Sequence, residues 1–411
     1  MTVADDALAL TDDLVRLRHR LHRQPEIGLD LPRTQATVLE ALSGLDLEIT
    51  TGKALSSVTA VLRGEGTVGR RGPGAKPGRR PVVLLRADMD ALPVHEELDV
   101  PYRSEVDGVM HACGHDLHVT SLVGAAHLLA AQRDSLPGDV VLMFQPGEEG
   151  WDGAGLMISE GVLDAAGRRA DAAYALHVMS GLAPQGQVLS RPGPLLAASD
   201  GLFVTLHGRG GHGSAPHNAA DPVPAIGEIV MGAQAVAGRV VGPFQTGLVT
   251  FGKVKAGTRR NIIPATAYAE ATIRTVDPAV REKLRDALVR YCEGVAAAHG
   301  LTAEVRFEPE YPVTVNDAGE FAFVRETLTE LLGEGRFGEM PDPIAGAEDF
   351  SRVIAEVPGV MVFLGAALEG RDWQTAPDNH SALAGFDDAV LPSGAALLAA
   401  LAERRLTQLA G

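Results

Sequence analysis

The hydrophobic pattern of the first 200 residues alternates between amphipathic segments and fully apolar ones. Leucine and valine recur at helical spacing over 5–23, and a second helical stretch covers 33–42. Continuous apolar runs follow, and such runs are typical of strands buried on both faces, as in a parallel sheet. These runs cover 82–87, 140–144 and 172–176, with a shorter β-rich stretch at 57–62. Helical periodicity over 117–132, between the first two runs, predicts a β-α-β unit.

The pattern then changes, and strands of alternating character are separated by two long helices. The predicted order is β-α-β-β-α-β, which is the ferredoxin-like arrangement. Its elements are strands at 202–206, 248–254, 265–274 and 302–307 and helices at 222–237 and 278–298. The earlier alternation resumes afterwards and includes the apolar run 360–364. We therefore predict a mixed, mostly parallel α/β sheet flanked by helices, formed by 1–198 and 311–411 and interrupted by an α+β domain at 199–310.

Charge and cysteine content exclude several classes of protein. With 36 Lys and Arg against 53 Asp and Glu, the net charge of −17 opposes non-specific binding to nucleic acid. The one basic cluster lies in the Gly- and Pro-rich segment 64–81, which we expect to be a mobile loop. Two cysteines cannot form a disulfide framework, and neither a secretory pattern nor a long apolar window is present. We therefore expect a soluble cytoplasmic protein that binds neither nucleic acid nor membrane.

Polar residues follow each buried run, at the carboxyl ends of strands, where open α/β sheets bind their ligands. Cys113 and His115 flank a glycine, so a thiolate and an imidazole can face one cation, although a helix cap beside a free cysteine fits this pair equally well. Glu148 and Glu149 follow the second run, where neighbouring side chains diverge, but such a pair alone is more often a surface turn. The significance of each pair therefore depends on whether they converge.

If the polar residues that follow the buried runs converge on one point, a metal site becomes the favoured interpretation. A single histidine such as His177 or His380 is weak evidence for such a site on its own. The candidate ligands are Cys113, His115, Glu149, His177 and His380. Five ligands exceed what one tetrahedral zinc needs, but they suit two divalent ions about 3.5–4 Å apart that share an activated water. Glu148 would then remain as the general base. Asp88 and Asp90 would lie at the edge of the site, where a carboxylate orients a ligating imidazole.

Five strings of the sequence resemble one known family. They cover 86–93, 110–118, 144–150, 210–217 and 346–351. In order, and over nearly the whole chain, they are similar to the amidohydrolases that include hippurate hydrolases, auxin-conjugate hydrolases and N-acyl-amino-acid deacylases. The resemblance implies a dinuclear metal amidohydrolase whose catalytic domain is interrupted by a lid or dimerisation domain. It also implies a homodimer or higher homo-oligomer, formed through the inserted domain.

Carried over by motif, the five candidate ligands resemble the family's metal ligands, and Glu148 resembles its general acid/base. Asp90 matches an aspartate of the wider clan, which includes acetylornithine deacetylase. Where that clan has a metal-binding histidine two residues earlier, this chain has Asp88, and the resemblance implies that Cys113 supplies the missing ligand. The substitution leaves zinc, manganese, cobalt and nickel all open as the bound ions.

The resemblance also assigns roles in the inserted domain. His212 would donate a hydrogen bond to the oxyanion, in the same or the partner subunit, and Asn261 and Arg274 would hold the substrate carboxylate. Without the resemblance, His212 is an ordinary turn residue and Arg274 an exposed sheet residue. The implied reaction is hydrolysis of the amide bond of N-acyl amino acids, hippurate-like or N-acetylated. A dipeptidase, an aminobenzoyl-glutamate-type hydrolase and a non-catalytic metal-binding relative remain as alternatives, and the acyl group and amino acid stay open.

Overall fold

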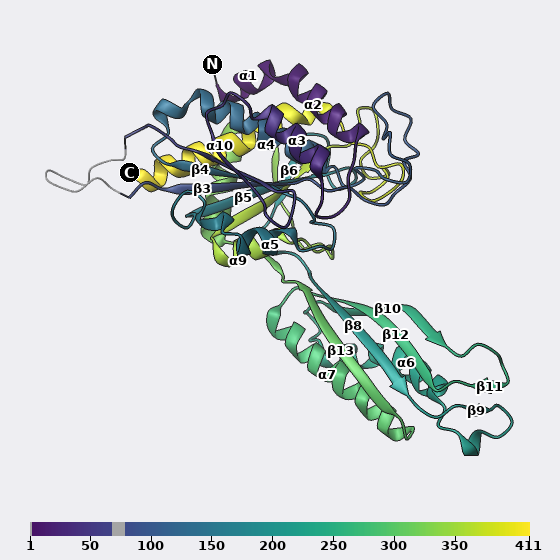
Figure 1. The fold of residues 1–411 in the computed structure, drawn as a ribbon. Helices are drawn as coiled ribbons and strands as arrows, with labels where there is room; N and C mark the ends of the chain where they lie inside the picture. The colour runs from purple at the N-terminus through teal and green to yellow at the C-terminus, as the bar shows by residue number, and fades with distance from the viewer. Residues whose placement is uncertain (1, 68–78) are drawn as a thin grey trace. The chain divides into compact units, whose positions relative to one another are not determined.

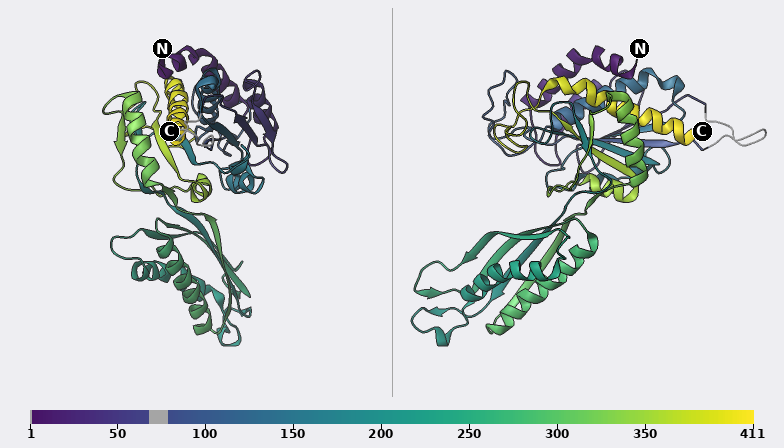
Figure 2. Two further views of the ribbon diagram at one scale, coloured as in Figure 1. Left: turned by 90° about the vertical axis from the view of Figure 1, so that its left-hand side faces the viewer. Right: turned by 180° about the vertical axis from the view of Figure 1, so that it is seen from behind.

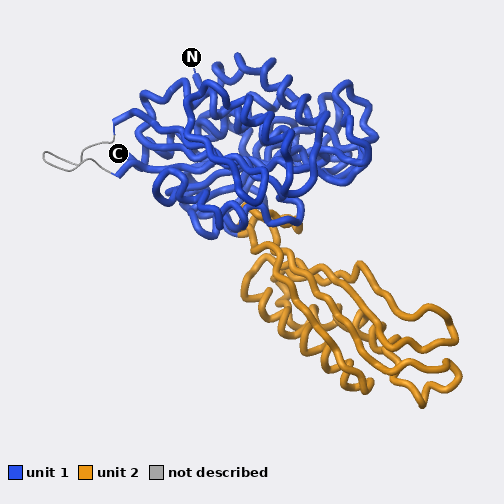
Figure 3. The backbone as a smooth tube through the Cα atoms, in the orientation of Figure 1, with its two compact units in different colours: residues 1–193, 315–341, 352–411 blue, residues 194–314, 342–351 orange. Residues whose placement is uncertain are grey.

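The computed structural model describes residues 2–67 and 79–411, which form two compact units (Figure 3). Unit 1 comprises Met1–Gly193, Val315–Pro341 and Arg352–Gly411, and unit 2 comprises Pro194–Thr314 and Asp342–Ser351. The predicted insert at 199–310 falls within unit 2. The predicted mobile loop at 64–81 coincides largely with 68–78, which lie outside the described residues.

Unit 1 is built on an eight-stranded sheet with the order β1-β2-β4-β3-β5-β16-β6-β15. The central neighbours β4, β3, β5 and β16 run parallel, whereas β1 and β2 form an antiparallel edge. The strands are β1 (Glu48–Thr51), β2 (Val58–Leu62), β3 (Val82–Asp88), β4 (Asp139–Gln145), β5 (Ala172–Met179), β6 (Val188–Ser190), β15 (Phe337–Glu339) and β16 (Gly359–Gly365). Because β3, β4 and β16 are buried along their whole length, their sequences read as continuous apolar runs.

Helices cover both faces of this sheet (Figures 1 and 2). They are α1 (Val3–Ala9), α2 (Thr11–Arg23), α3 (Pro32–Ala41), α4 (His115–Ala131), α5 (Gly153–Ser159), α8 (Ala318–Leu332), α9 (Phe350–Glu356) and α10 (Leu391–Ala410). Helices α4 and α10 pack together on one face, and α5 and α9 lie on the other. In the described part of the chain, no helix combines the length and apolar character that crossing a membrane requires.

Two helix boundaries differ from those that the periodicity predicts. The helix predicted over 5–23 is two helices that meet at Leu10, because the Thr11 hydroxyl donates to the Leu8 carbonyl and the chain restarts there with acidic residues in a new first turn. Helix α4 begins at His115, two residues before the predicted start at 117, because Gly114 caps it in the left-handed region at φ +81°. His115 therefore lies on a helix rather than in a loop.

Unit 2 contains a four-stranded antiparallel sheet with the order β10-β12-β8-β13. Its main elements are β8 (Ala198–His207), α6 (Pro222–Val240), β10 (Gly247–Ala256), β12 (Thr266–Thr275), α7 (Pro278–Ala298) and β13 (Thr302–Tyr311), which is the predicted β-α-β-β-α-β order. Both helices lie on one face of the sheet (Figure 2), and Cys292 is buried in the core that the helices and the sheet enclose. The short strands β9 (Gly211–His212) and β11 (Ile262–Ile263) pair with each other, while β7 (Gly193–Leu196) and β14 (Thr314–Asn316) lie where the chain passes between units.

Candidate metal centre

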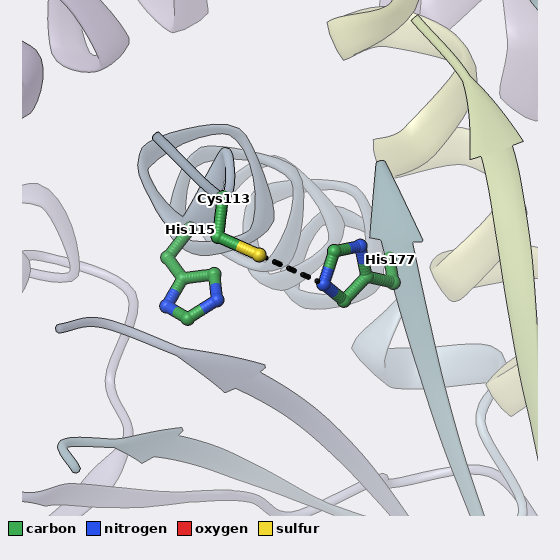
Figure 4. A group of neighbouring side chains, drawn as sticks. All are labelled: Cys113, His115 and His177. Carbon is green, nitrogen blue, oxygen red and sulfur yellow. Dashed lines mark hydrogen bonds between the residues drawn. The ribbon is translucent and has the colours of Figure 1, made fainter. Parts of the chain in front are cut away.

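Cys113 and His115 enter the centre from the turn that begins helix α4. Cys113 lies just before the helix, and His115 occupies its first turn (Figure 4). Gly114, between them, has φ +81°, and a Cβ added there would lie 2.4 Å from the Cγ2 atom of Val178. Only glycine therefore permits this turn to pack against strand β5, which places the thiol beside His177, the next ligand candidate.

His177 and His380 converge on the same thiol from distant parts of the chain. His177 projects from β5, and its Nε2 atom lies 3.4 Å from Sγ of Cys113 (Figure 4). His380 lies in the loop between β16 and α10, and its Nε2 atom is 3.2 Å from the same sulfur. Its backbone has φ +71°, a conformation that few residues other than glycine adopt. The strained backbone thus turns the imidazole of His380 toward Cys113.

Glu148 and Glu149 lie in the loop after β4, which Asp90 anchors. The backbone N–H groups of Glu148 and Glu149 donate to the two carboxylate oxygens of Asp90, at 2.9 and 3.1 Å. Oε1 of Glu149 lies 3.1 Å from Nε2 of His380 and 3.9 Å from Nε2 of His115. Both glutamates therefore face the centre, from a loop whose position is fixed by a fully buried carboxylate.

The five candidate ligands form two groups that share the sulfur of Cys113. Ligand atoms of Cys113, His115 and His177 all lie within 4.8 Å of one another, and so do those of Cys113, Glu149 and His380. Among the described residues, no hydrogen bond satisfies either ring nitrogen of His115 or Oε1 of Glu149, although all three atoms are buried. Buried polar atoms without partners are costly unless a ligand completes them. A thiolate, imidazoles and a carboxylate fit zinc or a neighbouring transition metal, so these residues suit a pair of divalent ions.

The carboxylates around the centre favour positive charge on two of its histidines, His115 and His380. Burial opposes ionisation of His115, but the charge of Asp88 and the neighbouring carboxylate of Asp90, 3.6 Å from Nδ1, outweigh it and raise the pKa of His115 well above its ordinary value. The hydrogen bond with Cys113 and the close contact with the Glu149 carboxylate raise the pKa of His380 to about 10. Burial raises the pKa of Glu149, yet the adjacent imidazole of His380 and the charge of His115 lower it overall. Divalent cations would satisfy the same negative groups.

A second histidine of helix α4, His118, also supports the centre, although the sequence analysis predicts no role for it. The Val178 N–H donates to Nε2 of His118 at 2.8 Å, so the proton lies on Nδ1, which donates to Asp88 at 2.5 Å. The second oxygen of Asp88 accepts from Arg86 at 2.7 Å. His118 therefore fixes the backbone next to His177. Its spacing of three residues from His115 places both histidines on one helix face, but that spacing alone does not predict the bonds that His118 makes.

The three residues of unit 2 to which a role was assigned do not lie together. Strands β9 and β11 pair His212 with Ile262, which brings Asn261 beside His212. Arg274 pairs with Ser199 near the opposite end of β12, eight residues beyond Thr266, a span of about 27 Å along an extended strand. That Asn261 and Arg274 hold the substrate carboxylate stays a prediction, and the pairing places them on different parts of unit 2.

His212 and Arg274 are each oriented by hydrogen bonds to neighbouring residues, Ser214 in the turn after β9 and Ser199 and Thr272 on β8 and β12. The Ser214 N–H donates to Nδ1 of His212 at 3.1 Å, so the proton of a neutral ring lies on Nε2, which can donate outward. Nη1 of Arg274 donates to the Ser199 hydroxyl at 2.5 Å and to the Thr272 hydroxyl at 2.7 Å. Both side chains thus keep part of their donor capacity for a ligand.

An α/β sheet with a thiolate, imidazoles and two carboxylates at its carboxyl edge defines a metal-dependent hydrolase. The chain belongs to the peptidase family M20/M25/M40, whose model matches residues 84–404. This match confirms the family resemblance on which the sequence-based prediction rested.

Individual relatives cover almost the whole chain. It is 37% identical to thermostable carboxypeptidase 2 of Saccharolobus solfataricus over 402 residues, which are 97% of this chain and 96% of the relative. It is 34% identical to N-acetyl-L-cysteine deacetylase of Bacillus subtilis, covering 89% of this chain and 82% of that protein. It is 35% identical to IAA-amino acid hydrolase ILR1-like 4 of Arabidopsis thaliana, covering 97% and 87%.

The fold is shared with solved structures as well. The YXEP protein of Bacillus subtilis, described as a dinuclear metal binding peptidase of the M20 family, matches with a TM-score of 0.81. The two sequences are 29% identical, and the match covers 97% of this chain and 99% of that one. The predicted mixed, mostly parallel α/β fold is therefore confirmed.

Proposed function

We propose that this protein is a metal-dependent amidohydrolase that cleaves the amide bond of N-acyl amino acids. The observation that carries the proposal is the position of Glu148, whose carboxylate lies within 4.8 Å of ligand atoms of His115 and Glu149. It is a titratable group at the edge of the donor set, which is where a general base must lie. The deacetylase and the IAA-amino acid hydrolase among the relatives support an acylated amino acid as substrate.

Two divalent ions would be held by Cys113, His115, Glu149, His177 and His380. Bound ions of this kind polarise the amide carbonyl and lower the pKa of water toward about 7. Glu148 accepts the proton of the attacking water and returns it to the departing amine. The outward N–H of His212 stabilises the oxyanion that develops on the carbonyl oxygen, a contribution of about 3–4 kcal/mol where it has been measured in other enzymes. The identity of the ions and the cytoplasmic location both stay predictions.

We propose further that the active form is a homodimer. The position of Arg274, about 27 Å along β12 from Thr266, supports this, because the His212–Asn261 pair belongs to the separate strand pair β9–β11 and a small substrate cannot span such a length. One protomer would supply Arg274 to the substrate carboxylate, and its partner would supply His212 and Asn261. A guanidinium whose Nη1 is already fixed by Ser199 and Thr272 is well oriented for a carboxylate.

The test is Glu148→Gln, measured as metal content and as turnover of a side-by-side panel. We expect the variant to keep its metal and to lose turnover by about two to four orders of magnitude, as removal of a general base does elsewhere. Wild-type turnover in this variant would refute the mechanism. The panel contains hippurate, N-acetyl amino acids and dipeptides. The carboxypeptidase relative favours a second candidate, a carboxypeptidase or dipeptidase activity, which preferential turnover of peptides would support.

A further inference from the structure

We infer that Asn379 is a positioning residue that holds three ligand-bearing segments of the metal centre in register. The inference rests on the proposed metal centre and extends it to a side chain that binds no ion. Asn379 precedes His380 in the loop between β16 and α10, and it is half-buried. Its neighbours in space are separated from it by about 200 residues of sequence or more.

The amide of Asn379 uses both its donor and its acceptor atoms. Nδ2 donates to the carbonyl of Val178 at 3.0 Å and to the carbonyl of Cys113 at 3.3 Å, and it lies 3.8 Å from Sγ of Cys113. Oδ1 accepts from the N–H and from the hydroxyl of Ser180, each at 3.0 Å. Carbonyl acceptors thus face the nitrogen and donors face the oxygen, so the orientation of the amide is fixed by its surroundings.

These bonds connect three of the five candidate ligands. The Cys113 carbonyl belongs to the turn before α4, and the Val178 carbonyl also accepts from Nδ1 of His177, at 2.8 Å. Asn379 adjoins His380, whose own N–H donates to the carbonyl of Ala112 at 2.9 Å. The Asn379 amide therefore connects the turn that carries Cys113, the end of β5 and the loop that carries His380.

The same contacts explain why the left-handed backbone of His380 persists. A histidine at φ +71° relaxes unless its neighbours hold it, and the Asn379 amide together with the Ala112 carbonyl fixes the backbone on either side of the Asn379–His380 peptide bond. An aspartate has the shape of asparagine but lacks the two donors. It would place negative charge against two carbonyl oxygens and close to the thiolate, so Asn379→Asp separates shape from hydrogen bonding.

The chain offers a matched control, because Asn316 makes an equivalent set of bonds away from the centre. Its Nδ2 donates to the Ser190 hydroxyl and to the carbonyls of Arg191 and Met361, and its Oδ1 accepts from the Met361 N–H. Asn316→Ala therefore removes a similar number of buried hydrogen bonds. It measures what the loss of such a network costs the fold alone.

The experiment titrates full-length, metal-stripped protein with cobalt(II). It follows the thiolate-to-cobalt charge-transfer absorption, which reports the bond from Cys113, and it records thermal unfolding of the same samples. We expect Asn379→Ala and Asn379→Asp to weaken cobalt affinity by about 10- to 100-fold and to weaken or shift the absorption. Asn316→Ala should lower Tm while leaving affinity and absorption as in the wild type.

Each other outcome is decisive. Wild-type affinity and absorption in both Asn379 variants, with only a fall in Tm like that of Asn316→Ala, would overturn the positioning role and leave the proposed function intact. Absence of cobalt binding in the wild type would overturn the metal centre itself. If the Asn379 variants do not fold, Ser180→Ala takes their place, because it removes one donor to Oδ1. We expect a several-fold loss of affinity in that variant, and unchanged affinity would overturn the inference.

Discussion

Asp90 provides a sharp test of how the Glu148–Glu149 loop is held. Its two carboxylate oxygens accept the backbone N–H groups of both glutamates, at 2.9 and 3.1 Å, and the side chain is fully buried. In Asp90→Asn, one oxygen can still accept, but the other position becomes an NH₂ group that faces a backbone N–H. The variant therefore loses one charge-assisted hydrogen bond and gains a clash between donors.

The magnitude follows from these two bonds. A hydrogen bond to a charged group contributes about 1.5–3 kcal/mol, and an unsatisfied buried donor costs a similar amount. We therefore expect a loss of about 3 kcal/mol in the free energy that holds the loop in place. A displacement of about 1 Å at a catalytic group reduces turnover by about 100-fold. We predict that Asp90→Asn lowers kcat/KM by about 10- to 100-fold in metal-saturated enzyme.

Steady-state kinetics and equilibrium denaturation of the same preparations check this prediction. Asp277→Asn is the matched control, because Asp277 also accepts two backbone N–H groups, those of Ala279 and Val280, but at the exposed start of α7. Asparagine caps helices about as well as aspartate does, so this control should change neither stability nor kcat/KM by more than about 0.5 kcal/mol. A kcat/KM within about threefold of the wild type in Asp90→Asn would refute the anchoring argument.

Three further predictions follow from particular residues. Gly114→Ala should reduce the free energy of unfolding by about 2–4 kcal/mol in chemical denaturation, because the added Cβ would meet Val178. Gly44→Ala has open space around the added Cβ at φ +83°, so it should reduce the free energy of unfolding by only about 1–2 kcal/mol, and equal losses in the two variants would contradict the prediction. Arg274→Lys should raise KM at least about tenfold with little change in kcat, and a fall in kcat alone would argue against carboxylate binding. Mixing inactive Glu148→Gln and His212→Ala subunits should restore about a quarter of wild-type activity if His212 acts in the partner's site, and none if it acts in its own.

The sequence predicted those strands whose side chains are buried on both faces of the sheet and those helices that bury one face at a regular spacing. The apolar runs at 82–87, 140–144 and 172–176 are β3, β4 and β5, because strands covered on both faces leave an unbroken apolar pattern. The edge strand β1 left no such pattern, since all its residues are exposed. The segment Asp342–Ser351, which belongs to unit 2, also carries no periodic signal, because its place there depends on contacts with a distant part of the chain.

The candidate ligands were predictable for a different reason than the residues that orient them. Cys113, His115 and Glu149 are of residue types that bind metal, and they lie after strands that share one edge of the sheet. Asn379 and His118 act through hydrogen bonds to backbone atoms of segments that are distant in the sequence, and the spacing of residues along the chain does not predict such bonds. Their roles follow only from coordinates, because the partners are brought together by the fold rather than by spacing.

Asp88 shows how the position of a candidate metal ligand depends on residues that bind no ion. One of its oxygens accepts from His118 and the other from Arg86, and all three side chains are buried, so both oxygens are already committed to hydrogen bonds. Asp88 thereby fixes the tautomer of His118, which holds the Val178 N–H and, with it, the backbone that carries His177. A carboxylate used in this way is poorly placed to bind an ion directly, whereas the sulfur of Cys113 lies within reach of both His177 and His380. The Cys113 thiolate can therefore belong to both ligand groups, the one with His177 and the one with His380. Asp88, through His118, fixes the position of the group that contains His177.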